Sequence, residues 1–130
     1  MRKFKFAKLV RDKILKQTAS HALKVESRTL DRKEYIEELK KKLVEETNEL
    51  LNAKEDELTG ELADIQEILD YLLEELDTSK KELNRKQQEK IEKSGAFKNK
   101  TFIETVAISE SDEWLDYYLE KYKEIKDKRG

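Results

Sequence analysis

The strongest constraint on the fold is an apolar pattern with the period of an α-helix. In residues 62–76 the apolar positions alternate three and four residues apart, which is the spacing of a helical bundle seam. These positions are Leu62, Ile65, Leu69, Leu72 and Leu76. A second stripe precedes them in the chain and consists of Ile36, Leu39, Leu43, Leu50 and Leu51. We therefore expect two amphipathic helices that pack against each other.

Capping and stop signals set the expected helix boundaries. Asp31 and Ser79 each stand three residues before a glutamate, which is the spacing of an N-terminal capping box. Gly95 is a typical helix stop, and Ser109 or Ser111 can cap a last helix that carries an aromatic stripe. The predicted helices cover about residues 8–19, 31–53, 61–76, 80–94 and 110–128.

Residues 97–108 interrupt this helical pattern. They are rich in Thr, Ile, Val and Phe, so we expect a short extended segment or strand near Phe97–Ile108. The predicted fold class is an all-α helical bundle of about four to five helices. A length of 130 residues suits a single domain over residues 1–130.

Composition excludes several classes of protein. The chain has no Cys, so a disulfide-stapled fold and a thiolate metal site are both impossible. Its apolar runs fall far short of the ~20 residues that a membrane helix needs, and lysines interrupt any signal-peptide core near the start. The 28 basic and 30 acidic residues nearly cancel, so bulk charge does not favour a nucleic acid polymer as a partner. We expect a cytoplasmic protein that does not bind membranes.

The balance of charged and apolar residues predicts association. Charged residues make up 45% of the chain and hydrophobic residues 36%. Helices that are polar on one side and strictly striped on the other often complete their core across a subunit interface. We therefore expect a homo-oligomer, a dimer or a tetramer.

Two acidic clusters lie on the two predicted central helices. Glu45, Glu46 and Glu49 occupy one helix, and Glu61 and Asp64 repeat the three-residue spacing on the next. Residues three or four apart share a helix face, and each cluster falls beside the apolar stripe of its helix. Eleven residues separate Glu49 from Glu61, and such a short connection makes the helices antiparallel neighbours. The two clusters should then meet at one end of the hairpin.

This convergence has two interpretations. Acidic clusters in a highly charged chain are commonly solvated faces that pair with nearby lysines, here Lys40, Lys41, Lys42 and Lys54. Converging carboxylates can instead hold a cation, since without one they would repel each other and raise each other's pKa values. Oxygen ligands without His or Cys suit Mg²⁺ or Mn²⁺, and such a site points to phosphate chemistry more than to a di-iron centre.

Three separated blocks of the chain resemble a known family, and they follow one another along the chain in the order typical of that family. The Glu45-Glu46-x-x-Glu49 and Glu61-x-x-Asp64 blocks are similar to the signature of the all-α nucleoside triphosphate pyrophosphohydrolases. This MazG-like group includes the phosphoribosyl-ATP pyrophosphohydrolases. The opening Lys8-Leu-Val-Arg-Asp-Lys-Ile14 and the segment Lys93-Ser-Gly-Ala-Phe-Lys98 resemble one branch of that group.

The resemblance implies hydrolysis of a nucleotide substrate to the monophosphate and pyrophosphate. The substrate would be an NTP, a dNTP or a related nucleotide such as phosphoribosyl-ATP, and the cofactor Mg²⁺, with Mn²⁺ possible. Glu46, Glu49, Glu61 and Asp64 would bind the metal. Glu45 would be a further ligand or would activate the attacking water, which makes Glu45 and Glu46 the catalytic candidates. Lys8, Arg11 and Lys98 are candidates for binding the substrate phosphates.

Some features depart from the family pattern. Leu15 stands where the opening block usually has proline, and Gly95-Ala-Phe97 replaces Gly-Gly-Phe. The helix expected over residues 110–128 lies beyond the resemblance. An alternative function is therefore a non-catalytic helical interaction module that uses the same scaffold and binds a partner through its aromatic C-terminal helix.

Overall fold

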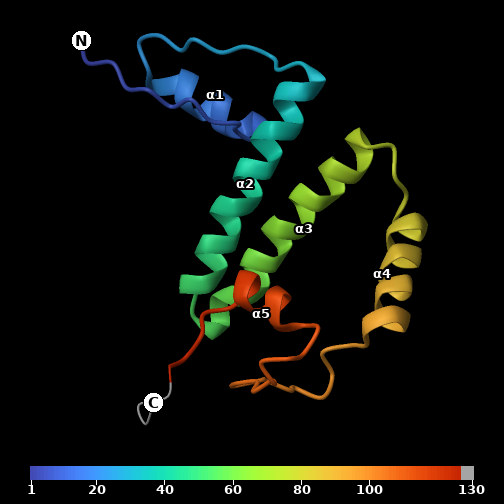
Figure 1. The fold of residues 1–130 in the computed structure, drawn as a ribbon. Helices are drawn as coiled ribbons and strands as arrows, with labels where there is room; N and C mark the ends of the chain where they lie inside the picture. Colours follow the sequence, from blue (N-terminus) through green and yellow to red (C-terminus); the bar gives the residue numbers. More distant parts are fainter. Residues whose placement is uncertain (127–130) are drawn as a thin grey trace. The chain divides into compact units, whose positions relative to one another are not determined.

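The computed structural model describes residues 1–126 as an all-helical protein, in which no strand occurs. The helices are α1 (Asp12–His21), α2 (Arg32–Asn52), the 3-10 helix η1 (Glu55–Glu57), α3 (Leu58–Glu75), α4 (Lys80–Ser94) and α5 (Leu115–Lys121) (Figure 1). The chain divides into one compact unit over Met1–Lys93 and another that begins at Ser94. The predicted all-α class with four to five α-helices is confirmed.

The centre of the first unit is an antiparallel hairpin of α2 and α3, which lie side by side (Figure 1). The predicted cap starts α2, because Asp31 Oδ1 accepts a hydrogen bond of 2.8 Å from the Glu34 amide. At the turn, Glu57 Oε1 accepts a 3.2 Å hydrogen bond from the Lys54 amide, and α3 follows directly. Leu39 on α2 and Ile68 on α3 are the buried apolar residues of this core.

The row of α3 that faces α2 differs from the predicted seam. Leu62 and Leu76 are more than half exposed, whereas Ile68 is buried. The exposed side chain of Leu51 likewise shows that the stripe expected on α2 is only partly used. Apolar residues cover two adjacent rows of α3, and periodicity alone does not say which row packs. A contact at the end of the hairpin, where Arg32 Nη2 donates to the Glu75 carbonyl at 2.9 Å, fits the row of Ile68.

Several boundaries differ from those predicted. Helix α1 begins at Asp12, not near Lys8, and α3 begins at Leu58, so Gly60 lies inside a helix. Helix α5 has only seven residues, because the chain enters it through turns: Asp112 Oδ1 accepts a 2.8 Å hydrogen bond from the Trp114 amide. The end of the predicted helix, residues 127–128, lies outside the described residues.

The signals that flank α4 are confirmed. Ser79 Oγ accepts a 3.1 Å hydrogen bond from the Glu82 amide at its start. After its end, Gly95 has a φ of +85°, a left-handed conformation that favours glycine. The following residues 97–108 form no strand, and the part of the chain that the structure describes offers no other strand to pair with. No helix among residues 1–126 has the length and apolar character needed to cross a membrane.

The second unit carries an aromatic cluster on and beside α5. The rings of Trp114 and Tyr117 meet edge to face at 5.5 Å between centroids, and those of Tyr117 and Tyr118 at 5.8 Å. Tyr122 lies 5.6 Å from Tyr118. Trp114, Tyr117 and Tyr122 remain exposed, so the cluster is a surface feature within this unit.

Candidate metal centre

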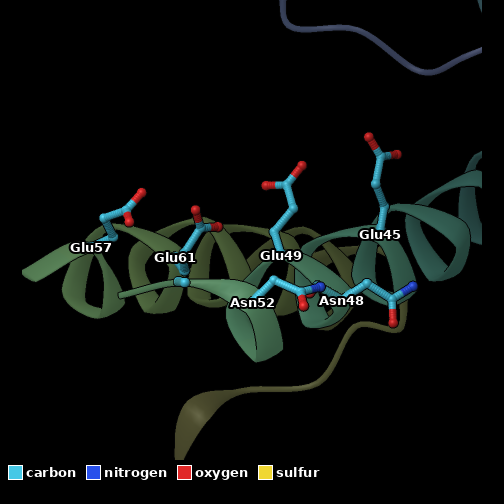
Figure 2. A pocket seen from close by; sticks show the side chains of 7 residues that line it. Glu45, Asn48, Glu49, Asn52, Glu57 and Glu61 are labelled. Atoms are coloured by element: carbon cyan, nitrogen blue, oxygen red, sulfur yellow. The ribbon is translucent and has the colours of Figure 1, made fainter. Parts of the chain in front are cut away.

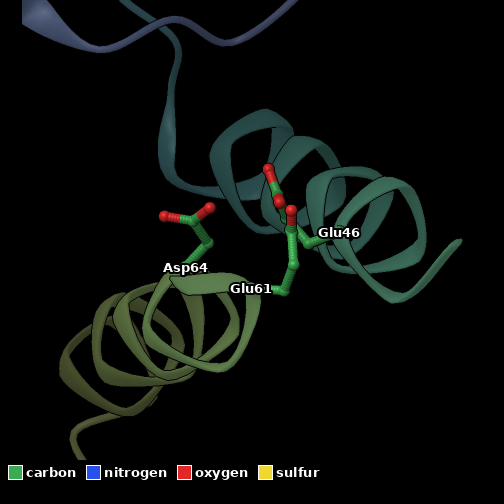
Figure 3. A group of neighbouring side chains, drawn as sticks. All are labelled: Glu46, Glu61 and Asp64. Atoms are coloured by element: carbon green, nitrogen blue, oxygen red, sulfur yellow. The ribbon is translucent and has the colours of Figure 1, made fainter. Parts of the chain in front are cut away.

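Three carboxylates from the two central helices meet near the turn of the hairpin. Glu46 on α2 and Glu61 and Asp64 on α3 each place one oxygen so that the three oxygens lie within 4.8 Å of one another (Figure 3). Figure 3 shows the Glu46 and Glu61 side chains side by side, with Asp64 on the adjacent turn of α3. The structure therefore brings acids from both predicted clusters together.

The helical register explains why these acids face each other. Glu46 lies seven residues after the buried Leu39, and Glu61 lies seven residues before the buried Ile68. Residues seven apart share a helix face, so both glutamates continue the rows that form the hairpin core. The sequence predicted them beside the apolar stripes, and the structure places them in the packed rows themselves. Their carboxylates enter the helix–helix interface.

The electrostatics of the cluster are unfavourable without a cation. Oε2 of Glu46 and Oε2 of Glu61 are buried and have no hydrogen-bond partner in the described part of the chain. Burial, together with the charges of Glu49, Asp64 and Glu61, raises the pKa of Glu46 to about 7. Burial and the charges of Glu49 and Asp64 also raise the pKa of Glu61.

The other two predicted acids lie beside this cluster. Glu45 and Glu49 are not among the three acids that converge, but both line an open hollow of about 450 Å³ at the end of the hairpin. Figure 2 shows the carboxylates of Glu45, Glu49, Glu57 and Glu61 on the same side of the hairpin. Glu57 is an acid that the sequence analysis missed, because we expected the segment before Gly60 to be an irregular break.

Two of the predicted phosphate-binding residues contact these acids. Lys8 Nζ lies 3.8 Å from Glu45 Oε1, and Arg11 Nη2 lies 3.3 Å from Asp64 Oδ1. Both pairs are solvent-exposed, so each contributes little to stability. Lys98 lies in the second unit, and its role stays a prediction.

Glu67 is a further residue of this region that the sequence analysis did not identify. Its Oε1 accepts a 2.7 Å hydrogen bond from Arg11 Nη1, and its Oε2 accepts one of 3.2 Å from the Tyr71 hydroxyl. A signal was present in the sequence, since Glu67 follows Asp64 by three residues as Asp64 follows Glu61. Glu67 orients Arg11 so that one guanidinium nitrogen remains directed at Asp64.

The donor set suits a hard divalent cation. All the converging atoms are carboxylate oxygens, and no His or Cys lies among the three residues. Glu46 and Glu61 each also have a buried oxygen without a hydrogen-bond partner among residues 1–126. A cation of this kind would replace the repulsion within the cluster by attraction to the oxygens. No protein-family model, curated protein or solved structure matches the chain. The functional interpretation therefore rests on the residues of the hairpin.

Proposed function

We propose that this protein is a Mg²⁺-dependent nucleoside triphosphate pyrophosphohydrolase of the cytoplasm. It would hydrolyse an NTP, a dNTP or a related nucleotide such as phosphoribosyl-ATP to the monophosphate and pyrophosphate. One observation carries the proposal: three carboxylates from two helices converge within 4.8 Å, and two of their oxygens are buried without a hydrogen-bond partner among the described residues. The resemblance to the all-α pyrophosphohydrolases supplies the reaction class.

The converging acids are the metal ligands in this proposal. Glu46, Glu61 and Asp64 hold the cation, and Glu49 stands beside them on the rim of the hollow. A bound divalent cation supplies electrostatic stabilisation of the charge that develops on the phosphate oxygens. Mn²⁺ has similar ligand preferences and would substitute for Mg²⁺.

Glu45 lies at the edge of the same hollow, away from the three converging oxygens. Lys8 Nζ at 3.8 Å and Lys42 Nζ at 3.5 Å flank its carboxylate. These two lysines hold the Glu45 carboxylate at the rim of the hollow, where it would orient or deprotonate an attacking water. We therefore assign Glu45 to the water and the inner acids to the metal.

Arg11 and Lys8 act on the substrate phosphates in this proposal. Both belong to the segment that leads into α1, and both already contact acids of the site. A cation on Asp64 competes with Arg11 for that carboxylate. Arg11 then keeps its hydrogen bond to Glu67 and turns its second nitrogen toward a phosphate oxygen, a geometry that suits the planar guanidinium.

A substrate panel tests the proposal. The purified full chain is incubated with each NTP and dNTP and with phosphoribosyl-ATP in Mg²⁺, and pyrophosphate release is measured. The expected result is turnover of at least one nucleotide that stops on chelation and returns with Mg²⁺ or Mn²⁺. If no member of the panel is hydrolysed with either metal, the proposal is wrong.

The exposed aromatic cluster favours a second candidate function. Trp114, Tyr117 and Tyr122 present the kind of rigid aromatic surface that protein interfaces use. In that case the chain is a non-catalytic interaction module, and the acids of the hairpin bind no metal. Titration with Mg²⁺ or Mn²⁺ separates the two candidates, because only the enzyme gains thermal stability at millimolar metal.

A further inference from the structure

The segment that leads into α1 is joined to the hairpin through charged side chains. No residue of α1 is buried, so packing contributes little to the position of this helix. Among the described residues, three ion pairs join the segment to the hairpin. They are Lys8 with Glu45, Arg11 with Asp64 and Arg11 with Glu67. The position of the segment therefore depends on these acids.

Arg11 makes the closer contacts of the two basic residues. The 3.8 Å separation of Lys8 from Glu45 is too long for a hydrogen bond. Arg11 instead donates from Nη1 to Glu67 Oε1 at 2.7 Å and from Nη2 to Asp64 Oδ1 at 3.3 Å. Arg11 is also the N-cap residue of α1, and its carbonyl accepts hydrogen bonds from the first turn of that helix. The acids that hold the Arg11 side chain therefore also fix the start of α1.

The two acids that hold Arg11 are not equivalent. Asp64 is one of the three carboxylates that converge, and the proposed function uses it as a metal ligand. Glu67 is not among those three, and the Tyr71 hydroxyl donates a 3.2 Å hydrogen bond to its Oε2. Each carboxylate oxygen of Glu67 thus has one partner, Arg11 on one side and Tyr71 on the other. These two contacts fix the orientation of Glu67 independently of the converging acids.

We propose that Glu67 is a positioning residue, which keeps Arg11 and the start of α1 on the hairpin when Asp64 binds the metal. The inference rests on the proposed function, which assigns Asp64 to the metal and Arg11 to a substrate phosphate. A carboxylate that coordinates a divalent cation attracts a guanidinium much less, because the charge of the cation dominates the site. Arg11 then loses one of its two acids and is held by the other. Without Glu67, the same exchange detaches Arg11 and α1 from the hairpin.

Distance measurements on the full chain test this proposal without a nucleotide. The chain has no cysteine, so Lys16→Cys on α1 and Lys40→Cys on α2 introduce two exposed sites for nitroxide labels. Pulsed electron paramagnetic resonance should give a narrow distance distribution that Mg²⁺ does not change. In Glu67→Ala the distribution should be narrow without Mg²⁺, since Asp64 still holds Arg11, and should broaden when Mg²⁺ is added.

A pair of substitutions gives the same comparison without a metal. Asp64→Ala removes the acid that the metal would occupy, so α1 should stay in place in this variant and detach in Asp64→Ala/Glu67→Ala. The matched control is Asp70→Ala, which removes an exposed acid of α3 that accepts its hydrogen bond from Gln66. A narrow distribution in the double variant, or in Glu67→Ala with Mg²⁺, would overturn the proposal. A broad distribution in the wild type, with or without Mg²⁺, or in Asp64→Ala would also overturn it.

Kinetics separate positioning from a merely structural role. Glu67→Ala should raise the KM for the nucleotide by roughly 10-fold or more and leave kcat within about 2-fold, because the lost Arg11–phosphate contact is binding that substrate and transition state share. Arg11→Ala should have a similar effect, and the double variant no larger one, since Glu67 acts through Arg11. Effects that add in the double variant would contradict the positioning role. If no nucleotide is hydrolysed, the proposed function is wrong, whereas the distances still decide the role of Glu67.

Discussion

The two ends of the α2–α3 hairpin differ in the charged groups that lie around their acidic side chains. At the end away from the turn, Arg32 from α2 meets the last turn of α3, with a 2.9 Å hydrogen bond to the Glu75 carbonyl and a 3.9 Å approach to its carboxylate. Near the turn, Glu46 meets Glu61 and Asp64. At one end the Arg32 guanidinium lies beside the acid Glu75, whereas at the other end three acids converge.

The difference shows what the acidic end lacks. Arg11 reaches Asp64, but Glu46 and Glu61 each keep a buried oxygen that has no hydrogen-bond partner within residues 1–126. The pKa of Glu46 is raised to about 7 as a consequence, because burial and the neighbouring carboxylates favour the protonated form. In the part of the chain that the structure describes, the basic residues at this end pair with Glu45 and Asp64, and none pairs with Glu46 or Glu61. This gap favours a ligand-binding role for the two buried glutamate oxygens.

The largest effect expected is on catalysis. Asp64→Asn keeps the shape of the side chain but removes the charge that would bind the metal, so pyrophosphate release should fall by roughly 100-fold or more. The control is Glu37→Gln, which changes an exposed acid of α2 outside the site. Full activity of Asp64→Asn, with helical circular dichroism retained, would show that the acidic end is not the catalytic site.

A charge reversal can make the acidic end resemble the other one. Glu61→Lys places a basic group between Glu46 and Asp64, as Arg32 is placed beside Glu75. The melting temperature of the cation-free protein should then rise, and the increase of about 3–10 °C expected for the wild-type chain in millimolar Mg²⁺ should disappear. Calorimetry of both proteins, with Glu37→Lys as the charge-matched control, measures this. An equal response to Mg²⁺ in Glu61→Lys and the wild type would place the metal elsewhere.

Several helix boundaries could be predicted from the sequence because their signals are local. The caps at Asp31 and Ser79 and the stop at Gly95 depend on a few neighbouring residues, and all three are confirmed. The convergence of the clusters followed from the short connection between antiparallel helices. Three of the five predicted acids do meet across the hairpin.

Helix rotation and tertiary pairs could not be predicted in the same way. Periodicity placed the seam on the row of Leu62, but α3 is apolar on two adjacent rows, and the contact with α2 selects the row of Ile68. The pairs of Arg11 with Asp64 and Glu67, more than fifty positions away in the chain, were not predicted, and the role of Arg11 at a substrate phosphate stays a prediction. The seven-residue α5 fell short of the predicted helix because turns at Asp112 replace its first part.

The free energy of unfolding should depend on pH because of the acids near the turn of the hairpin. The folded-state pKa of Glu46 is raised from 4.5 to about 7, so between these values the folded chain binds more protons than the unfolded chain. The free energy of unfolding should therefore fall as the pH rises from about 4.5 to about 7 and then level off. The raised pKa of Glu61 acts in the same direction.

Urea unfolding of the cation-free protein at several pH values measures this dependence. The useful quantity is the difference in the free energy of unfolding between the wild type and Glu46→Gln. Gln does not titrate, and the contributions of all other titratable groups cancel to first order. The wild-type chain should lose stability relative to Glu46→Gln as the pH rises. A difference that is constant with pH would mean that the pKa of Glu46 is the same in the folded and unfolded chains and that the acids do not repel strongly.

The smallest effect is expected for a change of Arg32, at the end of the hairpin away from the turn. Arg32→Gln removes an exposed pair, and such pairs contribute about 0–1 kcal/mol, so the melting temperature should fall by a few degrees at most. The response to Mg²⁺ should stay that of the wild type, because Arg32 lies at the opposite end from Glu46. If Arg32→Gln abolished that response while the fold persisted, the two ends would act as one unit. The proposed contrast between the end with the Arg32–Glu75 pair and the cation-binding end would then be wrong.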